Sequence, residues 1–273
     1  MPVVAITREM GSLGNEVAQG LGSELGLPVI YHEVIDHLAD RMRVRRSHVI
    51  RLLDGHAGLL ERLTADKVSM FLHSSDEVIA MAQQGKGAII RGWGATHLLR
   101  NVPHVVCVRV CAPFKVRHAR MMQRVGSDDA ETVAEEIHRN DEAHTAIMRR
   151  NFDLRWTDPE HYDVVLNTER VTVAECVDEI LRLVNSPKFA ETDQSRQRLD
   201  DLALAARVRA ALLRCAETRP IKVAISANAG IVTLAGCTDD EVLALIEIVM
   251  GVPGVRDVKY RAKIAEDEQP TRH

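Results

Sequence analysis

The chain is short of aromatic side chains, which make up 3% of its 273 residues. Proteins that bind single-stranded nucleic acid stack bases on such rings, so this class of protein is not expected here. A basic excess is also missing, because 35 lysines and arginines against 39 acidic residues leave a formal net charge of −4. With neither stacking rings nor a positive field, we expect no nucleic-acid partner.

Long apolar runs and a leader segment are absent as well. No apolar run approaches the roughly 18–20 residues that a helix needs to span a bilayer. The N-terminus has no basic region followed by an apolar core, because Arg8 and Glu9 interrupt the first apolar stretch. We therefore expect no signal peptide, no transmembrane segment and a cytoplasmic protein.

Disulfides and a metal site are not indicated either. The five cysteines form no C-x-x-C pair, and Cys107 and Cys111 lie on one expected strand. At roughly 3.3 Å per residue these two are about 13 Å apart, which is too far for a disulfide. His32 and His37 are separated by five positions, so a helix would turn their imidazoles to different faces. We expect reduced thiols and no metal ligands.

The chain does have the composition of a globular protein, with 46% hydrophobic and 27% charged residues. Its first part alternates short apolar runs with helical patterns. Strands are expected at 3–6, 29–31, 88–90, 105–110 and 162–167, and helices at 16–25, 95–100, 114–125, 129–150 and 173–185, with a broken helical pattern over 33–84. Strands separated by helices predict an α/β fold, with a parallel sheet and helices on both faces.

The last third of the chain has a different pattern. Residues 186–199 are polar without a clear period, and we expect them to link a first domain, residues 1–185, to a second, residues 200–265. The second domain is expected to be a small α+β unit, with helices at 202–215 and 239–250 and strands at 221–226, 231–235 and 255–264. Residues 266–273 are expected to form a frayed tail.

The N-terminal segment carries the clearest sign of function. An apolar run at residues 3–6 is followed by a glycine turn and then an amphipathic stretch. This order is typical of a phosphate-binding loop, in which backbone N–H groups and a helix N-terminus face an anion. The usual signature, G-x-x-x-x-G-K-[ST], is not met, so an ordinary strand-to-helix connection remains an alternative. The candidate phosphate-binding residues are Gly11, Ser12, Leu13, Gly14 and Asn15.

Several segments resemble the cytidylate-kinase-like proteins, a branch of the P-loop nucleoside monophosphate kinases. In order they are 6–14 (ITREMGSLG), 26–28 (GLP), 91–95 (RGWGA), 112–113 (AP) with Arg117 and Arg120, and 158–168 (DPEHYDVVLNT). The resemblance covers about residues 3–184 and implies a P-loop-type parallel sheet. Residues 230–236 (GIVTLAG) and 251–258 (GVPGVRDV) resemble a BON domain, which implies a module that binds a lipid or protein surface.

The resemblance implies transfer of a phosphoryl group from ATP to a nucleotide such as CMP, with Mg²⁺. That chemistry depends on positioning and on positive charge around the transferring oxygens. Arg117, Arg120 and Arg124 are spaced by three and four residues and are the candidate catalytic arginines of a lid helix. A solvated helix face is the alternative for these three. Asp141 is either a carboxylate of that lid or an exposed helix acid.

Several positions depart from the family pattern, and all of them are polar sites of the family. Leu13 replaces a glycine and Asn15 replaces an arginine of the loop. Further departures are Trp93 in place of an arginine, Tyr31 in place of an acidic residue and His144 in place of an arginine. Arg8 and Arg91 flank the two glycine turns and are our candidates for the missing positive charge.

These departures leave three functions open. The first is a nucleotide-binding kinase-like protein with weak or altered activity. The second is a pseudokinase that acts as a regulatory or interaction protein. The third is a protein that binds a lipid or protein surface through its BON-like domain.

Overall fold

The structure is a computed structural model that describes residues 2–31, 45, 67–92 and 94–262. The chain divides into two compact units, Met1–Leu199 and Asp200–His273, and each is described by itself. Within the described ranges, no helix combines the length and the apolar character that a membrane crossing requires. Trp93 and the expected helical pattern over 33–44 and 46–66 lie outside these ranges.

The first unit is built on a five-stranded sheet with the order β2-β3-β1-β4-β5. Its strands are β1 (Val3–Arg8), β2 (Val29–Ile30), β3 (Ala88–Arg91), β4 (Val105–Cys111) and β5 (Val164–Asn167). Every neighbouring pair is parallel, as the sequence predicts. The inner strands are nearly continuous runs of buried Val, Ile and Ala, because a parallel sheet is covered on both faces.

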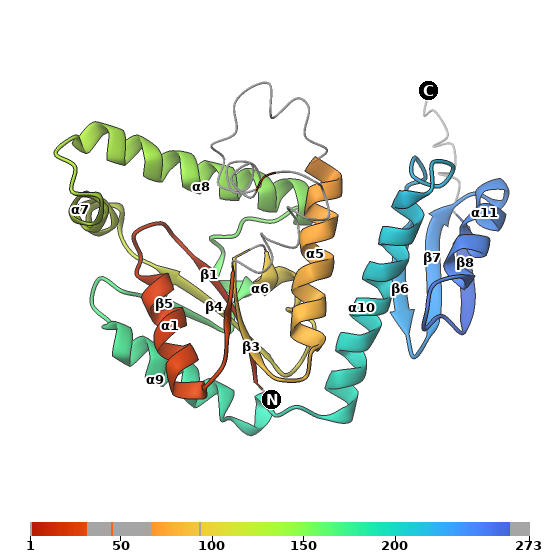
Figure 1. The fold of residues 1–273 in the computed structure, drawn as a ribbon, viewed down its shortest axis with the longest axis horizontal. Helices are drawn as coiled ribbons and strands as arrows, with labels where there is room; N and C mark the ends of the chain where they lie inside the picture. Colours follow the sequence, from red (N-terminus) through yellow and green to blue (C-terminus); the bar gives the residue numbers. More distant parts are fainter. Residues whose placement is uncertain (1, 32–44, 46–66, 93, 263–273) are drawn as a thin grey trace, which may run out of the picture. The chain divides into compact units, whose positions relative to one another are not determined.

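Helices cover both faces of this sheet (Figure 1). They are α1 (Gly14–Leu25), α5 (Lys67–Gln83), α6 (Ala95–Leu98), α7 (Phe114–Val125), α8 (Ala130–Phe152) and α9 (Val173–Val184), with the 3-10 helices η1 (Pro159–His161) and η2 (Pro187–Phe189). Helices α1 and α9 lie on one face, where Ile6, Leu21 and Ile180 are fully buried in a shared core. Each such side chain stabilises the fold by roughly 1.5–3 kcal/mol.

The strand order brings three connections to one edge of the sheet. Strand β1 lies between β3 and β4, and all three end at the same edge because they are parallel. The loop after β1, the glycine turn after β3 and the start of α7 after β4 therefore come together there. Helices α7 and α8 lie beyond that edge in Figure 1. Ligands of parallel α/β sheets bind at such an edge.

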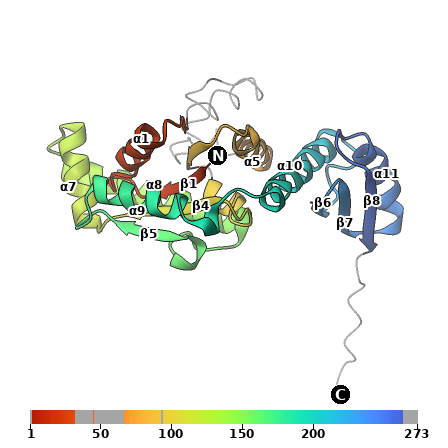
Figure 2. The ribbon, with the colours of Figure 1, turned by 90° about the horizontal axis from the view of Figure 1, so that it is seen from below.

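The second unit has a three-stranded sheet with the order β6-β7-β8, visible in Figure 2. Its elements are α10 (Asp193–Arg214), which begins in the first unit, and then β6 (Ala224–Asn228), β7 (Ile231–Cys237), α11 (Asp239–Met250) and β8 (Asp257–Ala262). Strands β6 and β7 are antiparallel, and β7 and β8 are parallel. Val208, Leu234 and Leu245 bring both helices and the sheet into one core.

The segment 186–199, expected to be irregular, contains η2 and the start of α10. The helix starts early because Thr192 and Ser195 bond to each other's backbone. The Ser195 N–H donates to Thr192 Oγ1 over 3.1 Å, and the Thr192 N–H donates to Ser195 Oγ over 2.9 Å. Such reciprocal caps fix a helix start without an apolar period, so the hydrophobic pattern does not reveal it.

Strand β6 also ends later than expected, at Asn228 instead of residue 226. The reason is the shortness of the turn to β7. Only Ala229 and Gly230 form it, with φ angles of 48° and 84°. A two-residue turn with both φ angles positive matches the twist of the strands and lets both continue to its edge.

Candidate functional site

The loop after β1 leaves the start of α1 open to an anion. The Val17 N–H donates to the Leu13 carbonyl over 3.0 Å, which closes the first helical turn. In the described part of the chain, nothing accepts a hydrogen bond from the N–H groups of Gly14, Asn15 or Glu16, and Leu13 provides no side-chain cap. Unpaired N–H groups at a helix N-terminus attract negative charge. The expected order of strand, glycine turn and helix is present.

Leu13 takes the backbone conformation that a glycine would take in this loop. Its φ is 61° and its ψ is 18°, in the left-handed region. For a residue with a Cβ this conformation costs roughly 1–2 kcal/mol. The loop therefore holds Leu13 in a conformation that glycine adopts more easily, and the leucine strains the backbone there.

Two glycines of the loop are required by close approach. A Cβ on Gly14 would lie 2.4 Å from Cβ of Arg8, and a Cβ on Gly11 would lie 2.7 Å from the Arg117 carbonyl oxygen. Both distances are shorter than a carbon can tolerate. The loop is thus packed directly against the end of β1 and the first turn of α7.

Arg8 is the candidate cation whose charge is not balanced. It is half-buried, and its side chain makes neither an ion pair nor a hydrogen bond among the described residues. Its neighbour at the second glycine turn behaves differently. Arg91 is buried at the end of β3, and its guanidinium lies 3.7 Å from the centre of the Tyr31 ring. Of the two candidates, Arg8 therefore has the charge that an anion beside the loop would neutralise.

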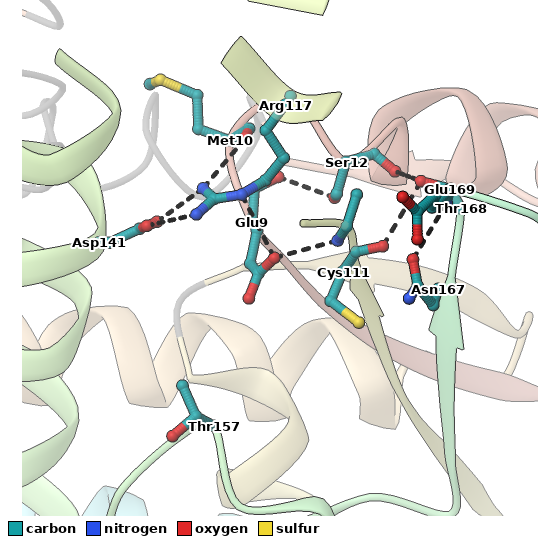
Figure 3. A network of polar contacts seen from close by, with 12 residues as sticks. Glu9, Met10, Ser12, Cys111, Arg117, Asp141, Thr157, Asn167, Thr168 and Glu169 are labelled. Carbon is teal, nitrogen blue, oxygen red and sulfur yellow. Dashed lines mark hydrogen bonds and ion pairs between the residues drawn. The ribbon is translucent and has the colours of Figure 1, made fainter. Parts of the chain in front are cut away.

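Arg117 lies against the loop, but two carboxylates neutralise its charge. Its Nη1 and Nη2 donate to Asp141 over 3.2 and 2.8 Å, and Nη1 also contacts the Met10 carbonyl at 3.3 Å. Its Nε lies 3.5 Å from Oε2 of Glu9. Figure 3 shows the guanidinium between these two acids. A solvated helix face, the alternative for this position, is wrong, because the side chain is 8% exposed.

The three expected lid arginines differ in their contacts and in their exposure. Arg120 donates to Oγ1 and to the carbonyl oxygen of Thr168, over 2.9 and 2.7 Å, and contacts the Gly11 carbonyl at 3.4 Å. Thr168 Oγ1 in turn donates to the Ser12 carbonyl over 2.8 Å. Arg120 therefore stabilises the loop backbone, directly at Gly11 and through Thr168 at Ser12. Arg124 is exposed one turn further along α7 and has no partner among the described residues.

Glu9 is a site residue that the sequence did not single out. Its Oε1 accepts from Nη2 of Arg109 over 2.6 Å, and its Oε2 accepts from the Ala112 N–H over 3.1 Å. It thereby joins the loop to β4 and to the start of α7. The available signal was a charged pair, Arg8-Glu9, that directly follows a buried strand.

Two histidines of the first unit have lowered pKa values, and one of them, His144, has Arg8 and Arg109 nearby. His144 of α8 stacks on Trp156 with ring centres 4.2 Å apart, and Arg109 lies 5.2 Å over the same indole. Burial, with Arg8, His97 and Arg109 nearby, lowers the pKa of His144 to about 3. Burial and the neighbouring His161 lower the pKa of His97 to about 4. His144 therefore supplies no positive charge at neutral pH, in contrast to an arginine at that position.

Two polar groups bear on cofactor binding. Oδ1 of Asn15 is buried at the loop without a hydrogen-bond partner in the described part of the chain. Among the described residues, one group of three possible metal ligands gathers within 4.8 Å, formed by Asp158, Glu160 and His161. Asp158 is engaged by Arg155 over 3.2 Å, and Glu160 is exposed. Among the described residues, the Asn15 oxygen is thus a buried side-chain acceptor at the loop that lacks a partner.

Comparisons place this architecture among known proteins. Residues 3–170 match the sequence model of a family described as the cytidylate kinase-like family. No curated protein matches the chain. An uncharacterized protein from Eubacterium ventriosum ATCC 27560 is similar in structure, at 20% identity and a TM-score of 0.54, over 68% of this chain and 99% of that chain. A shikimate kinase from Bacteroides thetaiotaomicron matches at 14% identity and a TM-score of 0.44, over 68% of this chain and 99% of its own.

Proposed function

We propose that this chain, which belongs to the cytidylate kinase-like family over residues 3–170, transfers a phosphoryl group from ATP to a nucleoside monophosphate such as CMP. One observation carries the proposal. The open N-terminus of α1 lies beside Arg8, a half-buried cation without a counter-ion among the described residues. An unpaired cation next to unpaired N–H groups favours an anionic ligand, and a polyphosphate chain fits that combination.

In the proposed complex with ATP, some residues bind the phosphates and others hold the loop in position. The N–H groups of Gly14 and Asn15 and the guanidinium of Arg8 bind phosphate oxygens. Arg120 holds the loop in place through its bonds to Thr168 and Gly11. Arg124 is free to approach the phosphates from α7. In this account Leu13 and Ser12 contribute through the backbone of the loop, since the Ser12 hydroxyl already donates to the Glu9 carbonyl over 2.8 Å.

The cofactor Mg²⁺ shields phosphate charge when it accompanies ATP. Asn15 is the residue of the loop that fits this group, because its unpartnered amide oxygen is a hard ligand that suits Mg²⁺ or a water bound to it. The oxygen and nitrogen of an amide exchange places by a half rotation, so the same side chain can instead donate to a phosphate oxygen. Either role gives the buried group the partner it lacks.

We expect the activity to be weak. Phosphoryl transfer depends on positive charge near the transferring oxygens, and removal of one such charge typically costs orders of magnitude in rate. Here Asn15 and His144 are neutral, and the charge of Arg117 is paired with Glu9 and Asp141. These three observations also favour the second candidate, a nucleotide-binding pseudokinase that signals without turnover.

The second unit supports a separate candidate function, binding to a lipid or protein surface. Its order of helix, hairpin, helix and strand agrees with the BON-like resemblance. Leu243, Met250 and Tyr260 are exposed by 75%, 49% and 46% of their surfaces. Leu243 and Met250 are seven residues apart and share one face of α11, and a contiguous apolar patch there would mark a contact surface.

The test is calorimetric titration of the full chain with ATP, CTP and CMP, each with Mg²⁺. We expect ATP to bind and CMP to bind more tightly once ATP is present. Arg8→Ala is expected to abolish ATP binding in a protein that remains folded, whereas Arg139→Ala, an exposed arginine of α8, leaves it intact. Unchanged ATP binding by the Arg8 variant would refute the site. A turnover assay with ATP and CMP then separates the kinase from the pseudokinase.

A further inference from the structure

The charge of Arg117 is taken up mainly by one residue, Asp141. The two guanidinium nitrogens Nη1 and Nη2 both face its carboxylate, at 3.2 and 2.8 Å. A two-point pair of this kind is among the stronger polar contacts in proteins. Glu9 contributes less, because its oxygens already accept from Arg109 and from the Ala112 N–H. Its distance to Nε of Arg117 is 3.5 Å, and that Nε has no hydrogen bond.

Arg117 is nevertheless fixed at the phosphate loop by its own backbone. The space where a Gly11 Cβ would stand is 2.7 Å from the Arg117 carbonyl oxygen, and Nη1 touches the Met10 carbonyl. In Figure 3 the side chain leaves α7 at the loop and points toward Asp141, with Ser12 on its other side. Because Nη1 contacts the Met10 carbonyl over 3.3 Å, the guanidinium lies beside the loop at which we propose that phosphate binds.

From this arrangement we infer that Asp141 is a positioning residue that holds Arg117 away from the phosphate site. The contact between Asp141 and Arg117 thereby sets the affinity of that site for phosphate. The inference rests on the proposed function, because it concerns the regulation of the same loop. A bound polyphosphate competes with Asp141 for Arg117. When the contact with Asp141 opens, Arg117 approaches the phosphate beside Arg8. The site then gains a positive charge that the neutral Asn15 does not supply.

The exposure of the two partners supports this direction of exchange. The Asp141 side chain is 26% exposed, so water can solvate it once the pair opens. The Arg117 side chain is 8% exposed and stays buried between α7, α8 and the loop. An arginine left there without a carboxylate would be an uncompensated buried charge, which is costly. An incoming phosphate removes that cost, whereas a neutral ligand does not.

The test compares Asp141→Asn with Glu142→Gln, the adjacent exposed acid of the same helix, which has no partner among the described residues. The probes are ATP and inorganic tripolyphosphate, titrated by calorimetry at fixed ionic strength. We expect Asp141→Asn to bind both probes more tightly, by roughly five- to 150-fold, the usual range of coupling between sites. The Glu142 variant is expected to bind as the parent chain does.

A double-mutant cycle separates the proposed role from a general charge effect. In an Arg117→Met background, Asp141→Asn is expected to change tripolyphosphate affinity by less than about twofold, because the carboxylate then has no arginine to hold. If Asp141→Asn strengthens binding equally with and without Arg117, the proposal is wrong. If Arg117→Met does not fold, Asp141→Glu provides the second check, since a retained carboxylate should keep the parent affinity.

The outcomes also separate this inference from the proposed function. If the parent chain binds ATP and Asp141→Asn binds it no better, the nucleotide site stands and the holding role of Asp141 is refuted. If only Asp141→Asn binds ATP, the contact closes the site completely in the parent chain, and both proposals gain support. If neither binds ATP or tripolyphosphate, both proposals fail.

Discussion

Gly14 faces the side chain of Arg8 at the start of α1, where a Cβ would lie 2.4 Å from Cβ of the arginine. Because both atoms are close to the backbone, neither can turn aside. We predict that Gly14→Ala displaces the loop and abolishes stabilisation by ATP, with a loss of roughly 1–3 kcal/mol in the free energy of unfolding. Urea denaturation with and without ATP measures both effects.

The control for this variant is Gly26→Ala at the other end of α1. Gly26 has a φ of 63° and nothing within 4 Å of its added Cβ, so the substitution strains the backbone without a collision. It should cost roughly 1–2 kcal/mol and leave ATP stabilisation in place. Loss of the ATP effect in this variant too would mean that general destabilisation explains the result.

Leu13→Gly is predicted to strengthen phosphate binding. The glycine relieves the left-handed strain at φ 61° and removes a side chain from the loop. The relief, roughly 1–2 kcal/mol, is about half offset by the greater freedom of glycine in the unfolded chain, roughly 0.5–1 kcal/mol. Stability should therefore rise by roughly 0.5–1 kcal/mol while affinity for tripolyphosphate rises. Weaker binding by the glycine variant would contradict this account of the loop.

The lowered pKa of His144 predicts acid sensitivity. The pKa of His144 is lowered from the usual 6.5 to about 3, so the folded state binds fewer protons than the unfolded state between those values. Its contribution to stability is complete above about pH 6.5 and is lost as the pH falls from there toward about 3.

The variant that tests this is His144→Phe, which keeps a ring against Trp156 and removes the titrating group. Between about pH 7 and about pH 4 it should lose less stability than the parent chain, as measured by urea denaturation at each pH. Equal losses in the two proteins would show that His144 has the same pKa in the folded and unfolded states, which would contradict the prediction. Carboxylates titrate in both proteins, so the difference between the two curves isolates the histidine.

The two capped helices predict separate effects on the two units. Thr172 caps α9 and Thr238 caps α11, each in a reciprocal pair with a glutamate three residues later. Replacement of either threonine by alanine should cost about 1 kcal/mol. Because the caps lie in different units, we expect Thr172→Ala to shift only the unfolding of the first unit and Thr238→Ala only that of the second. Calorimetric scans that show one shared transition for both variants would contradict this.

The sequence predicts the parts of the fold that depend on residues close together along the chain. The strand, turn and helix from Val3 to Leu25 were predictable because the apolar run, the glycines and the helical period are local. The bounds of α7 and α11 were predicted for the same reason. The start of α10 was not, because side-chain caps at Thr192 and Ser195 define it and no apolar period does.

The site was predictable in position but not in detail. Glycines and arginines marked the loop and α7, yet spacing alone could not show that Arg117 would meet Asp141 of a second helix. Glu9 meets Arg109 across a separation of 100 residues, so no local pattern reveals that contact. Such pairs depend on which strands and helices the fold brings to one edge of the sheet.

The most direct measurement of the central claim is a titration of the isotope-labelled chain with ATP and Mg²⁺, observed through its backbone amide resonances. The account predicts that the N–H signals of Gly14 and Asn15 shift strongly, because these groups would then donate to phosphate oxygens. Adenosine, which lacks the phosphates, should leave them in place. If ATP leaves both signals unmoved while the chain is folded, the loop does not bind phosphate and the proposed function is wrong.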